Sequence, residues 1–252
     1  RCRGSVKMKS SRYMKRFYRD WTRAKELYPT HIVAKETDLL IFTNKPLKPG
    51  LAEERIRAYR WDIENYINRD HRFLTALKPI PVEINASPIV KDMAGQSKKA
   101  NVGPMSTVAG AIAEFLGKDL LKAGYKDVIV ENGGDIFLKT RSRRKVGVYV
   151  GRSKLWSKLQ LEIKPKDTPL GICTSSGTLG HSLNFGCADS VVIISKSCSL
   201  ADAVATATAN RINSKDDLQR ALDFARSVKG VLGVVIILKN NLITWGSVEF
   251  CK

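Results

Sequence analysis

Two side chains with hard oxygen atoms, Asp202 and Thr206, lie four residues apart in a segment that predicts a helix over about Leu200–Asn210. Side chains at this spacing share one helix face, about one turn apart. Mg²⁺ accepts such oxygen ligands, and one or two protein carboxylates suffice when a phosphate supplies the rest. The pattern Ser199-x-x-Asp202 also fits a capping box, in which the carboxylate only closes the helix start. The segment therefore predicts either a magnesium site or a capped structural helix.

The segment Gly103–Gly110 predicts a helix start that can bind an anion. Pro104 takes the first helical position, where its missing N–H costs nothing. The free amides of the first turn and the hydroxyls of Ser106 and Thr107 suit a phosphate, helped by the helix dipole. The neighbouring Lys98–Lys99 would add positive charge. The alternative is an ordinary capped helix without a ligand.

A third candidate is the turn Asn132-Gly133-Gly134, which follows a predicted strand. Asn-Gly between apolar runs is typical of a tight hairpin turn, because both residues accept positive φ. The same glycines would let a planar ring or a phosphate approach the backbone, with Asn132 or Asp135 bonding to it. The sequence predicts either a ligand-binding turn or a plain β-turn here.

A fourth candidate is the hydroxyl-rich run Thr174-Ser175-Ser176-Gly177. Its side chains can donate several hydrogen bonds to a polar ligand. No G-x-S-x-G pattern occurs, and a single histidine, His181, lies nearby, so a Ser-His-Asp triad is not indicated. A surface turn is the alternative.

Composition indicates a folded protein with an unusual charge. The chain has 252 residues and a hydrophobic fraction of 43%, which is enough to form a sizeable core. Its five cysteines are widely spaced and form no CxxC pair, so we expect reduced structural thiols. The sequence contains no apolar run that could span a membrane and no secretory signal. We therefore expect a soluble, cytoplasmic protein with no membrane partner.

The net charge of +19 predicts affinity for anions. Ten Lys or Arg residues lie in positions 1–26, interleaved with Tyr13, Phe17, Tyr18 and Trp21, a pattern expected of a nucleic-acid surface. A second basic cluster extends from Lys139 to Lys158. No nucleic-acid motif accompanies these charges, so a solvated basic face is the alternative.

The elements that must position these groups begin with a predicted hairpin over Thr30–Thr43, with a tight turn at Glu36–Asp38. Apolar residues spaced by three and four predict an amphipathic helix over Ala52–Asn68. Prolines at 79, 81 and 88 then exclude regular helix through about residue 90.

Further along, predicted strands outnumber predicted helices, and short turns that contain glycine join many of them. We expect an α+β fold, with a largely antiparallel sheet and packed helices, as one compact unit or two interwoven halves. The predicted domains are a basic segment, 1–29, and a domain over 30–252. The remaining predicted helices are Gly103–Lys122, Leu200–Asn210 and Lys215–Ser227, and the strands are Asp127–Val130, Ile136–Leu138, Val146–Val150, Leu159–Ile163, Leu170–Cys173, Ser190–Ile194, Val231–Leu238 and Leu242–Trp245.

The four candidate segments, in this order, resemble the ApbE-like superfamily, whose best-known members are FAD:protein FMN transferases. The chain looks most like the ApbE-related branch found in archaea and some bacteria. The resemblance spans roughly residues 30–245. It rests on Asn101–Gly110, Val130–Ile136, Ile172–His181 and Leu200–Thr206.

The resemblance implies a role for each segment. In the transferases an L-A-D-A-L-A-T helix supplies Asp and Thr to Mg²⁺, which implies Asp202 and Thr206 as metal ligands here. Their Asn-x-Gly-Gly turn lies beside the flavin nucleotide and is similar to Asn132–Gly134. Their A-T-S-G loop is similar to Thr174–Gly177. Their D-L-G-G-I-A-K-G helix start is similar to Asn101–Val108.

Two departures from the transferase pattern bear on the reaction. The lysine of that helix start falls at Thr107 or Val108 here, so a cation near the phosphates is missing. The transferases continue after the histidine with D-P-R-T-G, whereas this chain continues from His181 with S-L-N-F-G-C. The resemblance therefore implies a protein that binds FAD or a related nucleotide but transfers FMN to protein poorly.

The leading hypothesis is a flavin-nucleotide-binding protein with Mg²⁺ on the pyrophosphate and a possible FMN-transfer, nucleotidyl-transfer or pyrophosphate-cleaving activity, whose acceptor is unassigned. The alternatives are a nucleic-acid-binding protein and a structural module that lost its ligand. The predicted site residues are Asp135 and His181 for catalysis, Asp202 and Thr206 for the metal, and Gly103, Ser106, Thr107, Asn132, Gly133, Gly134, Thr174, Ser175, Ser176 and Gly177 for the nucleotide.

Overall fold

The computed structural model describes residues 26–148, 159–176 and 186–251. The basic residues before Glu26, the predicted nucleotide contact Gly177 and the candidate catalytic residue His181 lie outside these ranges. The boundary predicted between a basic segment and a domain at residue 30 stays a prediction.

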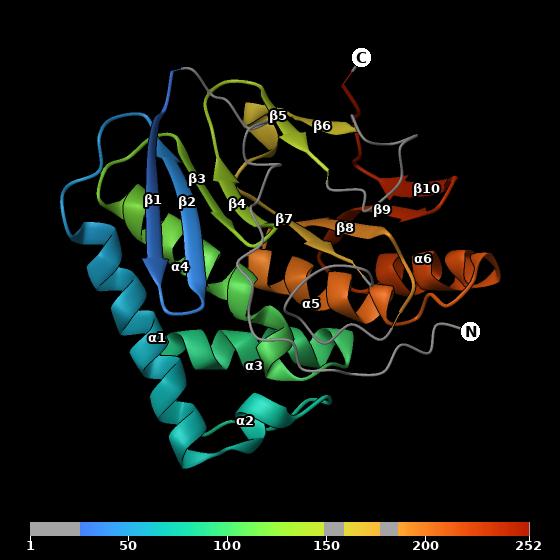
Figure 1. The fold of residues 1–252 in the computed structure, drawn as a ribbon, viewed down its shortest axis with the longest axis horizontal. Helices are drawn as coiled ribbons and strands as arrows, with labels where there is room; N and C mark the ends of the chain where they lie inside the picture. Colours follow the sequence, from blue (N-terminus) through green and yellow to red (C-terminus); the bar gives the residue numbers. More distant parts are fainter. Residues whose placement is uncertain (1–25, 149–158, 177–185, 252) are drawn as a thin grey trace.

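The framework is an eight-stranded sheet in which every pair of neighbours is antiparallel (Figure 1). Each strand pairs with the next one along the chain, except that the hairpin of β5 (Arg144–Gly147) and β6 (Gln160–Ile163) is inserted between β4 and β7. The strands, in sheet order, are β1 (Tyr28–Ala34), β2 (Thr37–Thr43), β3 (Val128–Asn132), β4 (Asp135–Lys139), β7 (Leu170–Ser175), β8 (Ser190–Ser195), β9 (Val231–Leu238) and β10 (Asn241–Gly246).

In the described residues, the α-helices lie in two insertions in this meander. One lies between β2 and β3 and the other between β8 and β9, so the sheet divides into two halves that each run strand, strand, helices, strand, strand. The halves meet at the β4–β7 pair. The α-helices are α1 (Leu51–Arg69), α2 (Arg72–Thr75), α3 (Pro88–Ala100) and α4 (Val108–Lys122) in the first insertion, and α5 (Cys198–Ala209) and α6 (Leu218–Ser227) in the second. Short 3₁₀ helices are η2 (Pro104–Thr107) in the first insertion, η4 (Lys215–Asp217) in the second and η3 (Pro165–Asp167) between β6 and β7.

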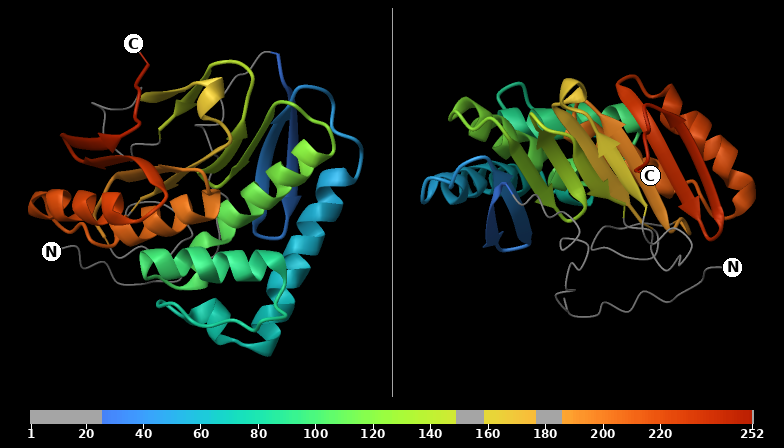
Figure 2. Two further views of the ribbon diagram at one scale, coloured as in Figure 1. Left: turned by 180° about the vertical axis from the view of Figure 1, so that it is seen from behind. Right: turned by 90° about the horizontal axis from the view of Figure 1, so that it is seen from above.

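Strand alternation divides the buried side chains between two faces of the sheet. Ile41, Val130 and Phe137 face the helices, which lie in front of the sheet when the molecule is seen from behind (Figure 2). Phe42 and Ile129 face the other way and pack with the β5–β6 hairpin. Both faces are therefore covered, and the prediction of an antiparallel α+β fold with packed helices is confirmed.

The expectation that prolines exclude helix through about residue 90 is wrong. Helix α3 begins at Pro88, which occupies the first helical position. A proline there loses no intrahelical hydrogen bond, since that N–H has no partner in the helix. The first hairpin is confirmed, with its turn at Lys35–Glu36 one residue earlier than predicted and Lys35 at φ 53°.

The start of α5 also differs from the predicted capping box. The N-cap is Ser197, whose hydroxyl accepts a hydrogen bond from the amide of Leu200 at 3.2 Å. Asp202 therefore lies beyond the first turn and does not cap its own helix. No helix in the described parts of the chain combines the length and the apolar character needed to cross a bilayer.

Candidate functional site

Asp202 contacts the first turn of another helix. One of its carboxylate oxygens, Oδ2, accepts a hydrogen bond from the amide of Gly110 in α4 at 2.9 Å, and the amide of Ala109 also donates to the carboxylate. This approach depends on glycine, because a Cβ at Gly110 would lie 2.6 Å from the carbonyl oxygen of Cys198 and 2.9 Å from the Cβ of Asp202. The start of α4, where a phosphate was predicted, thus donates amides to a carboxylate of α5.

A second carboxylate, Asp135, lies near Asp202. Burial, followed by the negative charge of Asp135, raises the pKa of Asp202 well above its ordinary value, against the opposing effect of the Gly110 and Ala109 amides. Asp135 is the first residue of β4 and is buried. A buried acidic group, Asp135, and a half-buried one, Asp202, thus lie close together at the junction of the two halves.

The predicted turn forms as expected and lies in the same region. Gly133 and Gly134 join β3 to β4 with φ values of 69° and 108°, and the side-chain amide of Asn132 donates to the carbonyl of Ala109 at 3.1 Å. A Cβ at Gly134 would lie 3.7 Å from the carbonyl oxygen of Thr174. The turn therefore contacts the start of α4 on one side and the end of β7 on the other.

The structure brings together predicted groups from three different segments: Asp202, the turn Asn132–Gly134 with Asp135, and Thr174. Asn132 and Asp202 bond to adjacent residues of α4, Ala109 and Gly110. Thr206 follows Asp202 by one turn on α5 and is buried. Ser175 and Ser176 are buried at the end of β7, next to Thr174, and Gly177 and His181 lie outside the described residues.

The helix start at Gly103 has a packing role. A Cβ there would lie 1.6 Å from the carbonyl oxygen of Ala76, so glycine is required where these two backbones touch. The hydroxyl of Ser106 donates to the carbonyl of Gly103 at 2.7 Å, and the buried hydroxyl of Thr107 donates to that of Pro104 at 2.7 Å. Both hydroxyl protons are used within the same turn, and the phosphate contacts predicted for these three residues stay predictions.

Three arginines in the described part of the second basic cluster pair with carboxylates. Arg141 donates to Asp127 at 2.8 Å, Arg143 pairs with Glu162 at 2.5 Å, and Arg144 pairs with Glu26. These arginines are therefore engaged in structural ion pairs, which leaves them poor substitutes for the missing cation of the helix start.

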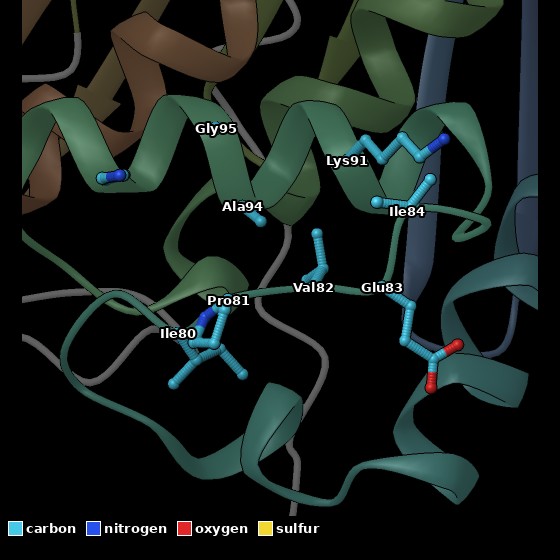
Figure 3. A pocket seen from close by; sticks show the side chains of 9 residues that line it. Ile80, Pro81, Val82, Glu83, Ile84, Lys91, Ala94 and Gly95 are labelled. Atoms are coloured by element: carbon cyan, nitrogen blue, oxygen red, sulfur yellow. The ribbon is translucent and has the colours of Figure 1, made fainter.

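Lys98 and Lys99, which were expected to add positive charge to the helix start, lie at a groove and at the protein surface. Lys98 lines a groove of about 420 Å³ between α3 and the segment Ile80–Ile84, with Lys91 further along the same helix. Figure 3 shows Val82 pointing from this segment towards α3. Lys99 is exposed and donates to Gln96 at 2.9 Å.

Two buried thiols lie beneath the site. The sulfur atoms of Cys173 in β7 and Cys198 in α5 are 3.5 Å apart and reduced. Burial raises the pKa of Cys173 and raises that of Cys198 to about 11, with Asp135 contributing in the same direction. Both thiols are protonated at neutral pH, as expected for structural cysteines.

Sequence reasoning missed the role of Ala109 and Gly110. A glycine inside an otherwise favourable helix is a weak signal of close approach by another backbone, but nothing in the pattern specifies α5 as the partner. Within the described residues no group of three or more His, Cys, Asp or Glu side chains forms a metal cluster. A cation held at Asp202 would therefore need most of its ligands from a bound anion or water.

Two solved structures share this fold at low sequence identity. The flavin transferase ApbE from Vibrio cholerae matches with a TM-score of 0.58 and 15% identity, over 88% of this chain and 98% of that one. The apo form of the flavinyl transferase ApbE from Pseudomonas stutzeri matches with a TM-score of 0.55 and 11% identity, over 87% and 94%. The fold is that of the ApbE-like superfamily, as the sequence resemblance implied.

A closer relationship is visible in the sequence. A model of the family described as AbpE bacteria matches residues 19–244. A UPF0280 protein of Methanocaldococcus jannaschii is 39% identical over 220 residues, which cover 85% of this chain and 89% of that protein. A UPF0280 protein of Methanosarcina acetivorans is 37% identical over 219 residues and covers 86% of each chain. The chain therefore belongs to the family described as AbpE bacteria, and the UPF0280 proteins are its relatives.

Proposed function

We propose that this protein binds a flavin nucleotide, FAD or a close relative, together with Mg²⁺, and that it transfers FMN to protein poorly. The fold supports the ligand class, because the structures it matches include a flavin transferase and a flavinyl transferase. The observation that carries the proposal is the convergence of Asp202, Asp135 and the Asn132 turn on the start of α4.

Asp202 and Thr206 are the residues that would hold the cation. The pKa of the half-buried Asp202 carboxylate is raised by desolvation and by a second carboxylate, and a divalent cation beside it would stabilise its charged form. Carboxylate and hydroxyl oxygens fit Mg²⁺. When bound, Mg²⁺ would neutralise charge on the pyrophosphate of the nucleotide.

The Asn132–Gly134 turn and Thr174 would contact the nucleotide. Gly133 and Gly134 carry no side chains, so a planar ring or a phosphate can approach the backbone of the turn closely. The charge of Asp135 raises the pKa of Asp202, so the two carboxylates interact. This interaction suits Asp135 to a role beside the cation better than to the role of an independent base. Catalytic roles for Asp135 and His181 stay predictions.

Weak transfer activity follows from the two sequence departures. Transfer requires groups that hold the phosphoanhydride and stabilise the departing nucleotide, and one preorganised charged contact typically accounts for about 10²–10³ in rate. The helix-start lysine and the Asp-Pro-Arg segment are both replaced here. If the two contacts act independently, their joint loss would slow transfer by on the order of 10⁴.

The first test is the absorbance spectrum of the purified protein, with mass spectrometry of any ligand released by heat, followed by FAD titration of the ligand-free protein. We expect flavin nucleotide to be bound. Absence of FAD, FMN or related nucleotide binding at about tens of micromolar would overturn the proposal.

The transfer half has its own assay. The protein is incubated with FAD, Mg²⁺ and an acceptor protein that carries a flavinylation sequence, and labelling is read by gel fluorescence beside an authentic transferase. We expect labelling slower by several orders of magnitude, and labelling at a comparable rate would reject this half of the proposal.

A further inference from the structure

Glu114 is a buried carboxylate that the proposed binding site does not use. It lies in α4, one turn after Gly110, and is 3% exposed. One of its oxygens, Oε2, accepts hydrogen bonds from the amide of Cys198 at 2.6 Å, the amide of Ser199 at 3.2 Å and the hydroxyl of Ser197 at 3.1 Å. Glu114 thus caps the N-terminus of α5.

Asp202 makes the corresponding contact in the other direction, from α5 to the start of α4. This carboxylate belongs to α5, one turn after Cys198, and accepts the amides of Ala109 and Gly110 at the N-terminus of α4. Each helix therefore supplies one carboxylate to the first amides of the other, an arrangement that we call the reciprocal cap. Because α4 and α5 belong to different halves of the sheet, the reciprocal cap joins the two halves at the site.

Further contacts hold Glu114 in place. Its second oxygen, Oε1, pairs with Lys118 at 2.6 Å on the more exposed side of α4. The hydroxyl of Ser199 donates to Asp92 of α3 at 2.6 Å, which ties a third helix to the same N-terminus. A carboxylate is favoured at this position by the amides and by the positive end of the helix dipole.

We propose that Glu114 is the positioning residue for the site: by capping α5 it fixes the orientation of Asp202 against α4. Glu114 itself touches neither the cation nor the nucleotide. The effect of Glu114 on ligand binding rests on the proposed function. The coupling between the Glu114 cap and the Asp202 cap can be measured in the protein without ligand.

Amide hydrogen exchange of the ligand-free protein tests the coupling. Glu114→Gln keeps the shape of the side chain and removes its charge, so we expect the amides of Ala109 and Gly110, which do not contact Glu114, to exchange about tenfold faster relative to core amides of β8. In the reverse direction, Asp202→Asn should speed exchange at Cys198 and Ser199. This second variant decides the question if the first does not fold.

Two variants serve as controls. Lys118→Met removes the outer ion pair and leaves the contacts with α5, so the amides of Ala109 and Gly110 should keep their protection. Asp127→Asn removes a buried carboxylate bound to Arg141 and destabilises the protein elsewhere, so all core amides should speed together. If Glu114→Gln behaves like Asp127→Asn, Glu114 is merely a stability residue and the proposal is overturned.

The ligand readout is FAD affinity with and without Mg²⁺. Glu114→Gln should weaken the Mg²⁺-dependent part about tenfold and leave Mg²⁺-independent affinity unchanged. An unchanged Mg²⁺ response would contradict the positioning role. If the wild-type protein binds no flavin nucleotide at all, the proposed function fails, and the exchange experiment still decides whether the two caps are coupled.

Discussion

Replacement of Gly110 by alanine tests the contact on which the site depends. The added methyl would lie 2.6 Å from the carbonyl oxygen of Cys198 and 2.9 Å from the Cβ of Asp202, well inside the 3.4 Å at which ordinary contacts begin. Overpacking of this kind costs about 1–3 kcal/mol, and a weakened hydrogen bond to a carboxylate costs about 1.5–3 kcal/mol more. We therefore expect Gly110→Ala to lower the free energy of unfolding by about 2.5–6 kcal/mol.

The assay is thermal unfolding, with Gly95→Ala as the matched control. At about 2–4 °C per kcal/mol for a protein of this size, Gly110→Ala should lower Tm by about 5–24 °C. Gly95 lies in α3 and has nothing within 4 Å of an added Cβ, so the same substitution there should raise Tm by about 1–4 °C through helix propensity.

A second control separates loss of stability from loss of the site. A Cβ at Gly117 would lie 2.1 Å from the ring of Phe137, so Gly117→Ala should destabilise the core and leave the Asp202 contact intact. Gly110→Ala alone should also reduce Mg²⁺-dependent stabilisation by FAD. A Gly110→Ala protein as stable as wild type would refute the close approach of α4 and α5.

Three further predictions follow from buried acidic groups and thiols. Asp202→Asn should abolish the stabilisation that Mg²⁺ gives together with FAD, measured as the shift in Tm when both are added. Burial raises the pKa of Asp127, but hydrogen bonds from Arg141 more than offset it and the net pKa is lowered. Its contribution should be present above about pH 4 and lost on further acidification, so urea titrations should show a flatter acid limb in Asp127→Asn. Cys173 and Cys198 should resist iodoacetamide at neutral pH in the native protein and react once it unfolds, as measured by mass spectrometry.

Local sequence patterns predicted most of the elements that surround the site. The Asn132 turn could be predicted because Asn-Gly-Gly between apolar runs specifies a two-residue hairpin connection, and it forms as expected. Helix α3 could not, because Pro88 marks a helix start as readily as an interruption. The N-cap of α5 was misplaced, because Ser199-x-x-Asp202 fits the capping-box pattern, whereas the actual N-cap, Ser197, has Leu200 three residues later and does not fit it.

The partners of the site residues could not be predicted. Asp202 and Gly110 are 92 positions apart, and their contact depends on how α4 and α5 cross the sheet. Glu114 is a single carboxylate within the apolar run of α4. Such a residue indicates that a buried partner exists, but it does not indicate which one. Spacing within one helix placed Asp202 and Thr206 on α5, while the amides that contact Asp202 come from the other half of the fold.

The most direct test of the account is calorimetric titration of FAD into the ligand-free protein, with Mg²⁺ and with the metal chelated, for the wild type and for Asp202→Asn. The account predicts wild-type binding on the order of tens of micromolar or tighter with Mg²⁺, weaker binding without it, and no Mg²⁺ effect in the variant. Wild-type binding that is absent under both conditions, or a full Mg²⁺ response in Asp202→Asn, would contradict it.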